Sequence, residues 1–244
     1  MKKLTVFCAA ACLAASAAAQ NHPDLHEVLD RQKGRNLIEI PKGTYTLDVR
    51  SNGPYKFHNL TDVHINGNGS TVICNNQEQA FSFYNCVRVE LRDLTIDYDP
   101  LCFTQGEITA VAEDGSWFDV RIDEGYPVTG LAANRVQFYD PQTRLLKRNS
   151  ITTYTSNYSA LKQLGHNLFR AVKNGTWSAG EQVGDLVVMD VKTDKPNAGV
   201  HTVMLNKCYN TKLENVTVYG SNTFSFFEKE GYANEYRNCV VDRG

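Results

Sequence analysis

The chain has 244 residues, 42% of them hydrophobic and 21% charged, and its formal net charge is -2. This balance is typical of a globular protein and excludes intrinsic disorder. Basic and acidic residues are mixed along the chain, so no basic stripe indicates nucleic acid as a partner.

The N-terminus has the pattern of a secretory signal peptide, which we place at residues 1–19. Lys2 and Lys3 precede an apolar run, and small alanines offer a cleavage site before Gln20. The run is too short to span a hydrocarbon core of about 30 Å, and no later segment could do so. We expect a bacterial protein that is secreted or periplasmic after cleavage; a lipoprotein signal at Cys12 is the alternative.

Residues 20–99 are expected to form an N-terminal cap and the first coils of a solenoid. Asp24 is a candidate N-cap for a short helix in which Leu25 and Leu29 share one face. Such a helix would cover the apolar end of a repeat stack, because terminal units must differ from the others. Alternating strands are expected within 37–47, on either side of a Pro-Lys-Gly turn.

Apolar pairs spaced i,i+2 recur along the chain and predict the first strand of successive coils. The pairs are Tyr55 with Phe57, Phe81 with Phe83, Val203 with Leu205, and Phe224 with Phe226. The step is 26 residues from Phe57 to Phe83 and 21 residues from Leu205 to Phe226. Two further alternating segments follow each pair. This period, with period-2 alternation inside it, predicts an all-β fold: a right-handed parallel β-helix with three short strands per coil.

Asparagines recur where the coils are expected to turn, at Asn59, Asn85, Asn215 and Asn238. Asparagine tolerates the left-handed backbone region, and stacked asparagines can hydrogen-bond from coil to coil. The run Gly67-Asn68-Gly69 predicts another tight corner with positive φ.

The long period stops in residues 100–198, and hairpin signals replace it. The expected turns are Asp114-Gly115, Asp140-Pro141, Asn174-Gly175 and Gly184-Asp185. We interpret this segment as an inserted small antiparallel β-barrel. The solenoid pattern resumes in residues 199–244 with two coils, which we expect to belong to the N-terminal part of a longer protein or to a truncated gene product.

Several of these segments resemble a known family. Ile38-x-Ile-Pro-Lys-Gly-Thr-Tyr and Ile65-Asn-Gly-Asn-Gly-Ser-Thr-Val resemble the opening of pectin-lyase-like right-handed β-helices. Residues 94–106, Leu-Thr-Ile-Asp-Tyr-Asp-Pro-Leu-Cys-Phe-Thr-Gln-Gly, look like the junction at which a barrel is inserted in glycoside hydrolase family 110, and 199–218 are similar to the re-entry there. The resemblance implies a bacterial, exo-acting α-1,3-galactosidase. Its catalytic aspartates lie on later coils, in Asp-Gly and Asp-Asp motifs; this sequence has no Asp-Asp pair, so they are not carried over.

Three residues are expected at the same outward position on consecutive coils: Asp97, Tyr219 and Asp242. Parallel strands stack about 4.7–4.9 Å apart, so the two carboxylates should lie about 9–10 Å apart. That is close to the separation of about 6.5–9.5 Å used by inverting glycosidases. Asp97 and Asp242 are therefore catalytic candidates, and Tyr219 is a substrate-binding candidate. A solvated row of strand ends is the alternative.

Glu228 is a third catalytic candidate. Glu230 is expected on the same side, and like charges that close together raise one pKa. A surface turn balanced by Lys229 is the alternative interpretation.

The cysteines indicate neither a disulfide framework nor a zinc site, because five remain after cleavage and none has paired spacing. Cys86 and Cys208 occupy the same place in their coils, which is typical of stacked apolar residues. No cofactor and no metal are expected.

Three functions remain open. The first is a secreted glycoside hydrolase that acts on a glycan, α-galactosidase-like, exo-acting and inverting, or an N-terminal fragment of one. The second is a polysaccharide lyase on the same scaffold. The third is a non-catalytic β-helix that binds glycans or serves in adhesion. The fold alone does not decide among them, since sites are grafted on scaffolds.

Overall fold

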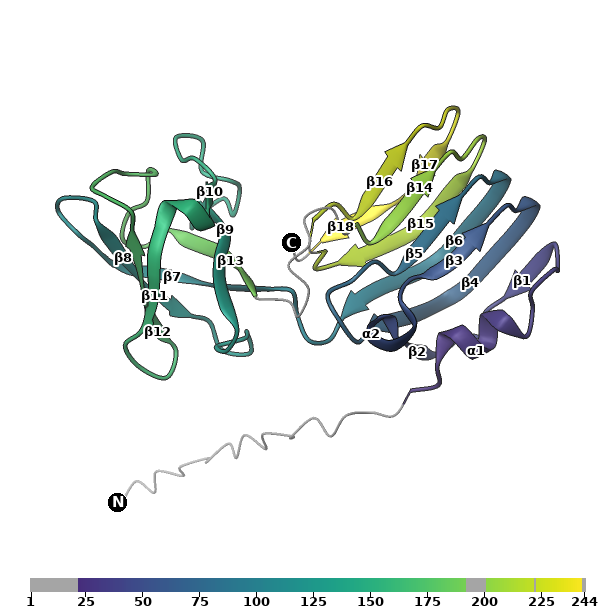
Figure 1. The fold of residues 1–244 in the computed structure, drawn as a ribbon, viewed down its shortest axis with the longest axis horizontal. Helices are drawn as coiled ribbons and strands as arrows, with labels where there is room; N and C mark the ends of the chain where they lie inside the picture. Colours follow the sequence, from purple (N-terminus) through teal and green to yellow (C-terminus); the bar gives the residue numbers. More distant parts are fainter. Residues whose placement is uncertain (1–21, 192–200, 222, 243–244) are drawn as a thin grey trace, which may run out of the picture.

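The structure, a computed structural model, describes residues 22–191, 201–221 and 223–242; the expected signal peptide lies outside these ranges. The described chain is an all-β protein with two short helices, α1 (Leu25–Asp30) and α2 (Val49–Asn52). Figure 1 shows two lobes, a parallel β-solenoid and an antiparallel sheet.

Two parallel sheets form the solenoid. One sheet has the order β1-β4-β6-β15-β17, with β2 paired to β4 and β18 paired to β15; the other has the order β16-β14-β5-β3. The strands of the first sheet are β1 (Leu37–Glu39), β2 (Thr44–Leu47), β4 (Thr61–Cys74), β6 (Val87–Tyr98), β15 (Lys212–Tyr219), β17 (Glu235–Arg237) and β18 (Val240–Asp242). The strands of the second sheet are β3 (Tyr55–His58), β5 (Phe81–Tyr84), β14 (Val203–Asn206) and β16 (Phe226–Lys229).

The register of the first three apolar pairs is confirmed. Phe57 pairs with Phe83, and Phe83 pairs with Leu205, in neighbouring parallel strands. The rings of Phe57 and Phe83 are stacked at 4.8 Å, and both side chains are buried. Alternation therefore places one side chain of every two inside the solenoid, where a buried phenylalanine contributes about 1.5–3 kcal/mol.

The expected fourth pair is wrong by two residues. Val203 pairs with Phe226, and Leu205 pairs with Glu228, so this step of the solenoid is longer than the predicted one. Phe224 lies outside β16, is 61% exposed, and packs its ring at 5.3 Å from that of His201. The strand could align either Phe224 and Phe226 or Phe226 and Glu228 with Val203 and Leu205. The prediction took the first pair because both of its residues are apolar.

The corners of the coils confirm the asparagine prediction. Asn59, Asn85, Asn215 and Asn238 have φ of 56°, 54°, 54° and 49°, in the left-handed region. The Asn85 amide donates to Asn59 at 2.8 Å, and the Asn238 amide donates to Asn215 at 3.2 Å. These bonds tie one coil to the next at its corners.

The helix α1 confirms the predicted cap. The carboxylate of Asp24 accepts a hydrogen bond from the backbone amide of His26 at 3.0 Å. Leu25 and Leu29 are fully buried against the first coil. An amphipathic helix therefore covers the apolar end of the stack, since a bare solenoid end would expose a layer of side chains.

The inserted sheet, which we define as β7 to β13, has the antiparallel order β10-β9-β13-β7-β8-β12-β11. Its strands are β7 (Phe103–Val111), β8 (Trp117–Ile122), β9 (Leu131–Tyr139), β10 (Thr153–Tyr154), β11 (Tyr158–Gln163), β12 (Leu168–Lys173) and β13 (Leu186–Val191). The 3-10 turn Thr155–Asn157 joins its two edge strands. Among the described residues no ladder joins the two edge strands β10 and β11 in this order, so closure of the sheet into a barrel stays a prediction.

The hairpin at Asp114-Gly115 is confirmed, because β7 and β8 are antiparallel neighbours on either side of it. The expected hairpin at Asn174-Gly175 is wrong. The strand before it, β12, pairs with β8 and β11, whereas the next strand, β13, pairs with β7 and β9. The side-chain amide of Asn174 donates to the carbonyl of Ser156, which turns the chain into a loop instead.

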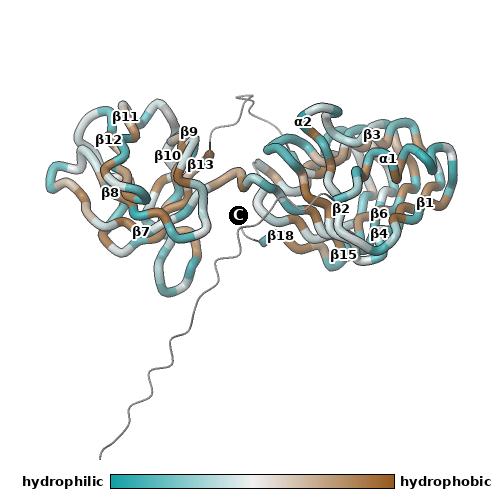
Figure 2. Tube along the Cα trace, turned by 90° about the horizontal axis from the view of Figure 1, so that it is seen from below, coloured by the Kyte–Doolittle hydropathy of each residue, from teal (hydrophilic) through white to brown (hydrophobic). Residues whose placement is uncertain are grey.

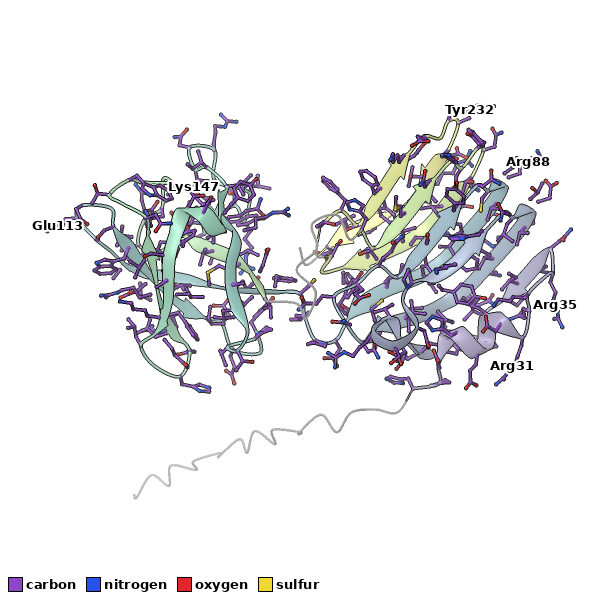
Figure 3. All side chains as sticks on the ribbon, viewed as in Figure 1. Arg31, Arg35, Arg88, Glu113, Lys147 and Tyr232 are labelled. Atoms are coloured by element: carbon purple, nitrogen blue, oxygen red, sulfur yellow. The ribbon has the colours of Figure 1, made fainter. Side chains whose placement is uncertain are left out.

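Each lobe has its own hydrophobic core. Hydrophobic and hydrophilic residues alternate along the strands of both lobes in Figure 2, as half-buried strands require. In Figure 3 Glu113 lies at the far tip of the inserted sheet, and Arg88 lies at an edge of the solenoid. No helix of the described residues combines the length and apolarity needed to cross a bilayer.

The corner at Gly67 yields a first testable prediction. Asn68 and Gly69 have φ of 52° and 70°, which confirms the expected turn. A Cβ on Gly67 would lie 2.4 Å from the carbonyl oxygen of Asp93 in the next coil. Gly67→Ala is therefore expected to lower the free energy of unfolding by about 1–3 kcal/mol, as measured by urea denaturation.

Gly43→Ala is the matched control, because the nearest atom to its added Cβ is a tyrosine ring carbon at 3.5 Å. Equal stabilities of Gly67→Ala and Gly43→Ala would contradict the close packing of neighbouring coils at this corner.

Candidate functional site

Polar side chains line the outer face of the inserted sheet on the side of the solenoid. On β9, Val136 and Phe138 are buried in the core of the inserted sheet, so Arg135, Gln137 and Tyr139 face the other way. On β13, alternation brings Val188 and Asp190 to that same face. Because β9 and β13 are antiparallel neighbours, these side chains form one continuous wall.

The solenoid supplies the opposite wall. Ser221, Thr223 and Ser225 lie between β15 and β16, and Val241 lies on β18, on the side of the solenoid nearest the inserted sheet (Figure 1). Together with the wall of the inserted sheet they enclose a cavity of about 310 Å³. A volume of this size is at the lower end of what ligand pockets have.

A second cavity, of about 210 Å³, adjoins the first. Both are lined by Phe103, Tyr139 and Val188, and the second also by Asp242 and Asp123. We call the two cavities together the intermodule cleft. It combines carboxylates, hydroxyls, one arginine in each cavity and aromatic rings.

A hydrogen-bonded chain fixes the solenoid wall of the cleft. The buried Tyr98 hydroxyl lies 2.8 Å from Thr202 Oγ1, and Thr202 donates to Ser221 Oγ at 3.0 Å. Thr223 Oγ1 lies 2.9 Å from the His201 ring nitrogen Nδ1. The hydroxyls of the cleft are therefore positioned by residues at the junction of the two lobes.

Asp190 is the most perturbed carboxyl group of the cleft. Burial raises its pKa from 3.8 to about 6, and the nearby Arg135 guanidinium opposes this shift only in part. A carboxyl group with a pKa near 6 remains partly protonated close to neutral pH and can act as a general acid. Perturbed groups of this kind are concentrated at functional sites.

Of the residues predicted from sequence, only Asp242 lines the cleft. Asp242 pairs with Tyr219 of the neighbouring coil. On the other side, Val218 pairs with Ile96, so the next residue, Tyr219, is aligned with Asp97. The three side chains thus follow the expected order along neighbouring coils. Neither Asp97 nor Tyr219 lines the two cavities, and the Asp97 carboxylate accepts from the amide of Tyr98 at 2.8 Å.

Glu228 lies elsewhere, on the last coil of the described residues. Its register partner Leu205 is buried in the solenoid, whereas Glu228 itself is exposed. Its carboxylate accepts from the amide of Asn234 at 2.8 Å and from the Tyr236 hydroxyl at 3.4 Å. Glu230 follows the end of β16 with φ of 54°, and its carboxylate lies 3.4 Å from Lys229 Nζ.

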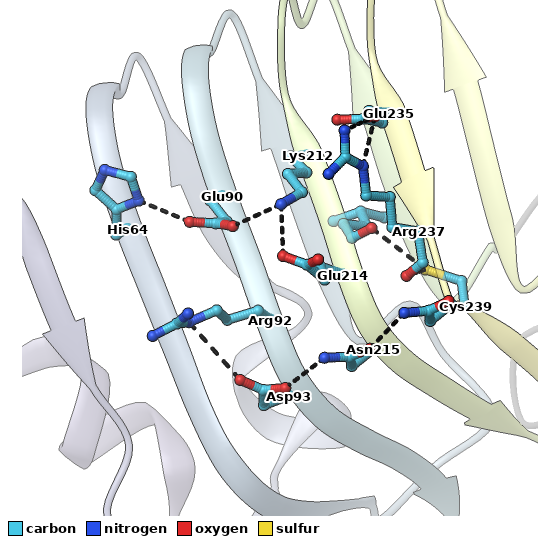
Figure 4. Close-up of polar contacts among 12 residues, drawn as sticks. His64, Glu90, Arg92, Asp93, Lys212, Glu214, Asn215, Glu235, Arg237 and Cys239 are labelled. Carbon is cyan, nitrogen blue, oxygen red and sulfur yellow. Dashed lines mark hydrogen bonds and ion pairs between the residues drawn. The ribbon is translucent and has the colours of Figure 1, made fainter.

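A row of charges crosses the outer face of the first solenoid sheet (Figure 4). His64 Nδ1 lies 2.8 Å from Glu90, and Lys212 Nζ lies 3.3 Å from Glu90 and 2.5 Å from Glu214. The hydrogen bond from His64, followed by that from Lys212, lowers the pKa of Glu90. Each charged side chain in the row has an oppositely charged neighbour. We therefore infer that the row holds neighbouring coils together rather than binding a ligand.

Asp190 and Arg135 are candidate site residues that were not predicted from the sequence. Alternation within 186–191 could have placed Asp190 on the outer face of a strand. Periodicity shows which residues share a face of the sheet. It does not show which face lies against the solenoid, because that depends on how the two lobes are arranged. Within the part of the chain that the structure describes, no three histidine, cysteine or acidic side chains gather as metal ligands.

No protein-family model matches this chain, and no curated protein is similar to it in sequence.

Proposed function

We propose that the protein is a carbohydrate-active β-solenoid whose intermodule cleft binds and hydrolyses a glycan. One observation carries the proposal: the cleft holds a carboxyl group with a raised pKa, Asp190, among hydroxyls, Arg135 and Tyr139. Sugars are bound by such hydrogen-bonding side chains together with aromatic faces. Glycosidases need one carboxyl group that stays protonated to donate to the leaving oxygen.

The parallel solenoid and the inserted antiparallel sheet support this class of protein. We propose further that the solenoid is right-handed, that the inserted sheet closes into a small barrel, and that the substrate is an α-galactosyl glycan, as the resemblance to glycoside hydrolase family 110 implies. From the expected signal peptide we propose that the protein acts outside the cytoplasm.

Two carboxyl groups divide the chemistry. Asp190 donates its proton to the glycosidic oxygen as the bond to the anomeric carbon breaks. Asp242, in the adjoining cavity, accepts a proton from the water that attacks the opposite face of the sugar. An inverting enzyme places the two groups about 6.5–9.5 Å apart, with space for that water.

The test is the release of free galactose from an α-1,3-galactosyl disaccharide. We expect galactose with the inverted anomeric configuration as the first product, followed by NMR during the first minutes. If an acidic polysaccharide instead gives an unsaturated product, detected by its ultraviolet absorbance, the protein is a lyase and not a hydrolase. If glycans bind saturably but no product forms, the protein is a binding module.

A further inference from the structure

We infer that Cys86 and Cys208 form a disulfide bond between two coils of the solenoid when the protein folds under oxidising conditions. Sequence spacing does not suggest this pair, because 122 residues and the whole inserted sheet separate the two cysteines.

The register places the two residues opposite each other. Tyr84 pairs with Asn206 at the ends of β5 and β14, and Val87 forms a parallel bridge with Tyr209. Both pairs have the same offset, so Cys86 lies opposite Cys208 between them. The Tyr209 amide also donates to the Cys86 carbonyl at 2.9 Å.

The spacing of coils suits a disulfide. Neighbouring parallel strands lie about 4.7–4.9 Å apart, within the Cα separation of about 4.4–6.8 Å that disulfides require. Both side chains are fully buried, and the two thiols are close enough to perturb each other's pKa. Cys86 Sγ now donates to the Phe57 carbonyl at 3.0 Å and would exchange that hydrogen bond for the bond to Cys208.

Cys86 is also suited to start the reaction. The interaction with the neighbouring Cys208 thiol lowers the pKa of Cys86 and raises that of Cys208. Burial instead raises the pKa of Cys74, Cys102 and Cys239. The thiolate is the nucleophile of thiol–disulfide exchange, so Cys86 is the better nucleophile of the two once β5 and β14 have paired but before the core closes over them.

The oxidant is a small disulfide such as oxidised glutathione. The Cys86 thiolate attacks one of its sulfur atoms, which forms a mixed disulfide and releases one glutathione thiolate. The Cys208 thiolate then attacks Cys86 Sγ and releases the second glutathione. The two cysteines lose two protons and two electrons, and the oxidant takes up both. Because both thiols are buried in the folded protein, the exchange takes place during folding.

The bond would join the coils on either side of the inserted sheet. A cross-link limits the unfolded chain more when it closes a longer loop, and this loop contains the entire inserted sheet. Opening of the inserted sheet would then leave β5 and β14 connected.

The first test is a peptide map of the wild-type chain after refolding with oxidised glutathione. Free thiols are alkylated under denaturing conditions, and the chain is digested without reduction. We expect one disulfide-linked peptide pair that contains Cys86 and Cys208, which separates on reduction. Alkylation of both cysteines, or a different partner such as Cys74, would overturn the inference.

The second test compares melting temperatures of oxidised and reduced protein. We expect the oxidised wild type to melt higher than the reduced wild type. That difference should vanish in Cys86→Ser and Cys208→Ser and remain in Cys239→Ser. Because each variant is compared with its own reduced form, a general loss of stability does not affect the result. A difference that persists in Cys86→Ser would assign the effect to another pair.

Discussion

Replacing Asp190 by asparagine is expected to lower kcat for glycoside hydrolysis by about 10²–10⁴-fold, the contribution of a positioned general acid. Asparagine keeps the shape and the hydrogen-bonding capacity of the side chain but has no acidic proton. Substrate binding, which also depends on Arg135 and Tyr139, should change much less. The measurement is the separate determination of kcat and KM with an α-galactosyl substrate.

The pH profile identifies the group. The pKa of Asp190 is raised to about 6, so the wild-type kcat/KM should fall as the pH rises above that value. This alkaline limb should be absent in Asp190→Asn. Glu113→Gln is the matched control, because Glu113 is exposed at the tip of the inserted sheet away from the solenoid (Figure 3). An unchanged profile in Asp190→Asn would assign the acid to another residue.

Stability gives an independent readout of the same carboxyl group. Its pKa in the folded protein is about 6, above the ordinary value of 3.8, so the folded state retains a proton that the unfolded chain has lost. The free energy of unfolding is therefore expected to fall as the pH rises from about 4 to about 6. Denaturation of Asp190→Asn should lack this contribution, whether or not the protein is an enzyme.

Replacing Glu181 by alanine is expected to lower the free energy of unfolding by about 3–5 kcal/mol, the cost of leaving a buried charge without its partner. Glu181 pairs with Lys173, and neither side chain is exposed. The Lys173 ammonium also donates to the Trp177 carbonyl at 2.8 Å and lies 4.6 Å from the Trp177 ring. These contacts do not neutralise its charge.

The same carboxylate holds the loop before β13. Glu181 accepts from the backbone amide of Ala179 at 2.6 Å and from the Ser178 hydroxyl at 3.4 Å. Since β13 carries Asp190, we expect Glu181→Ala to weaken glycan binding as well as stability.

The double variant Lys173→Met with Glu181→Leu is the control for the buried pair. It removes both charges and replaces them with apolar side chains, a change that is often neutral or stabilising. Urea denaturation at pH 7 should show the double variant closer to the wild type than Glu181→Ala. Equal losses in both would mean that packing of the loop, rather than the unpaired charge, determines the cost.

Regular parts of the fold were predictable because neighbouring coils repeat the same physical constraints. A second alternating segment was expected after each apolar pair, and the pairings of Ile65 with Leu91 and of Leu91 with Leu213 confirm it. The corner asparagines were predictable for a local reason, since few residues tolerate positive φ at low cost.

The errors arose where the pattern admitted two solutions. The pair Phe224 and Phe226 is more apolar than the pair Phe226 and Glu228, but the structure aligns the second pair with Val203 and Leu205 and leaves Glu228 exposed. Likewise, the turn at Asn174-Gly175 has a hairpin sequence, but its strand finds partners elsewhere in the sheet.

The candidate site was predictable only in part. Asp242 was identified because it ends a strand of the solenoid, where regular register gives its neighbours. Asp190 and Arg135 became recognisable only when the inserted sheet and the solenoid were seen to enclose one cavity. A site built between two modules has no signature within either module.

The insertion also affects how quickly the solenoid can assemble. The ion pair of His64 with Glu90 spans 26 residues, whereas that of Glu90 with Lys212 spans 122, because the inserted sheet lies between those coils. Contacts between distant segments slow folding. However, Phe103 at the start of the insertion pairs with Asp190 near its end. Once the inserted sheet has formed, it brings the two halves of the solenoid together, so its folding should precede and accelerate the docking of β14 and β15 onto β5 and β6.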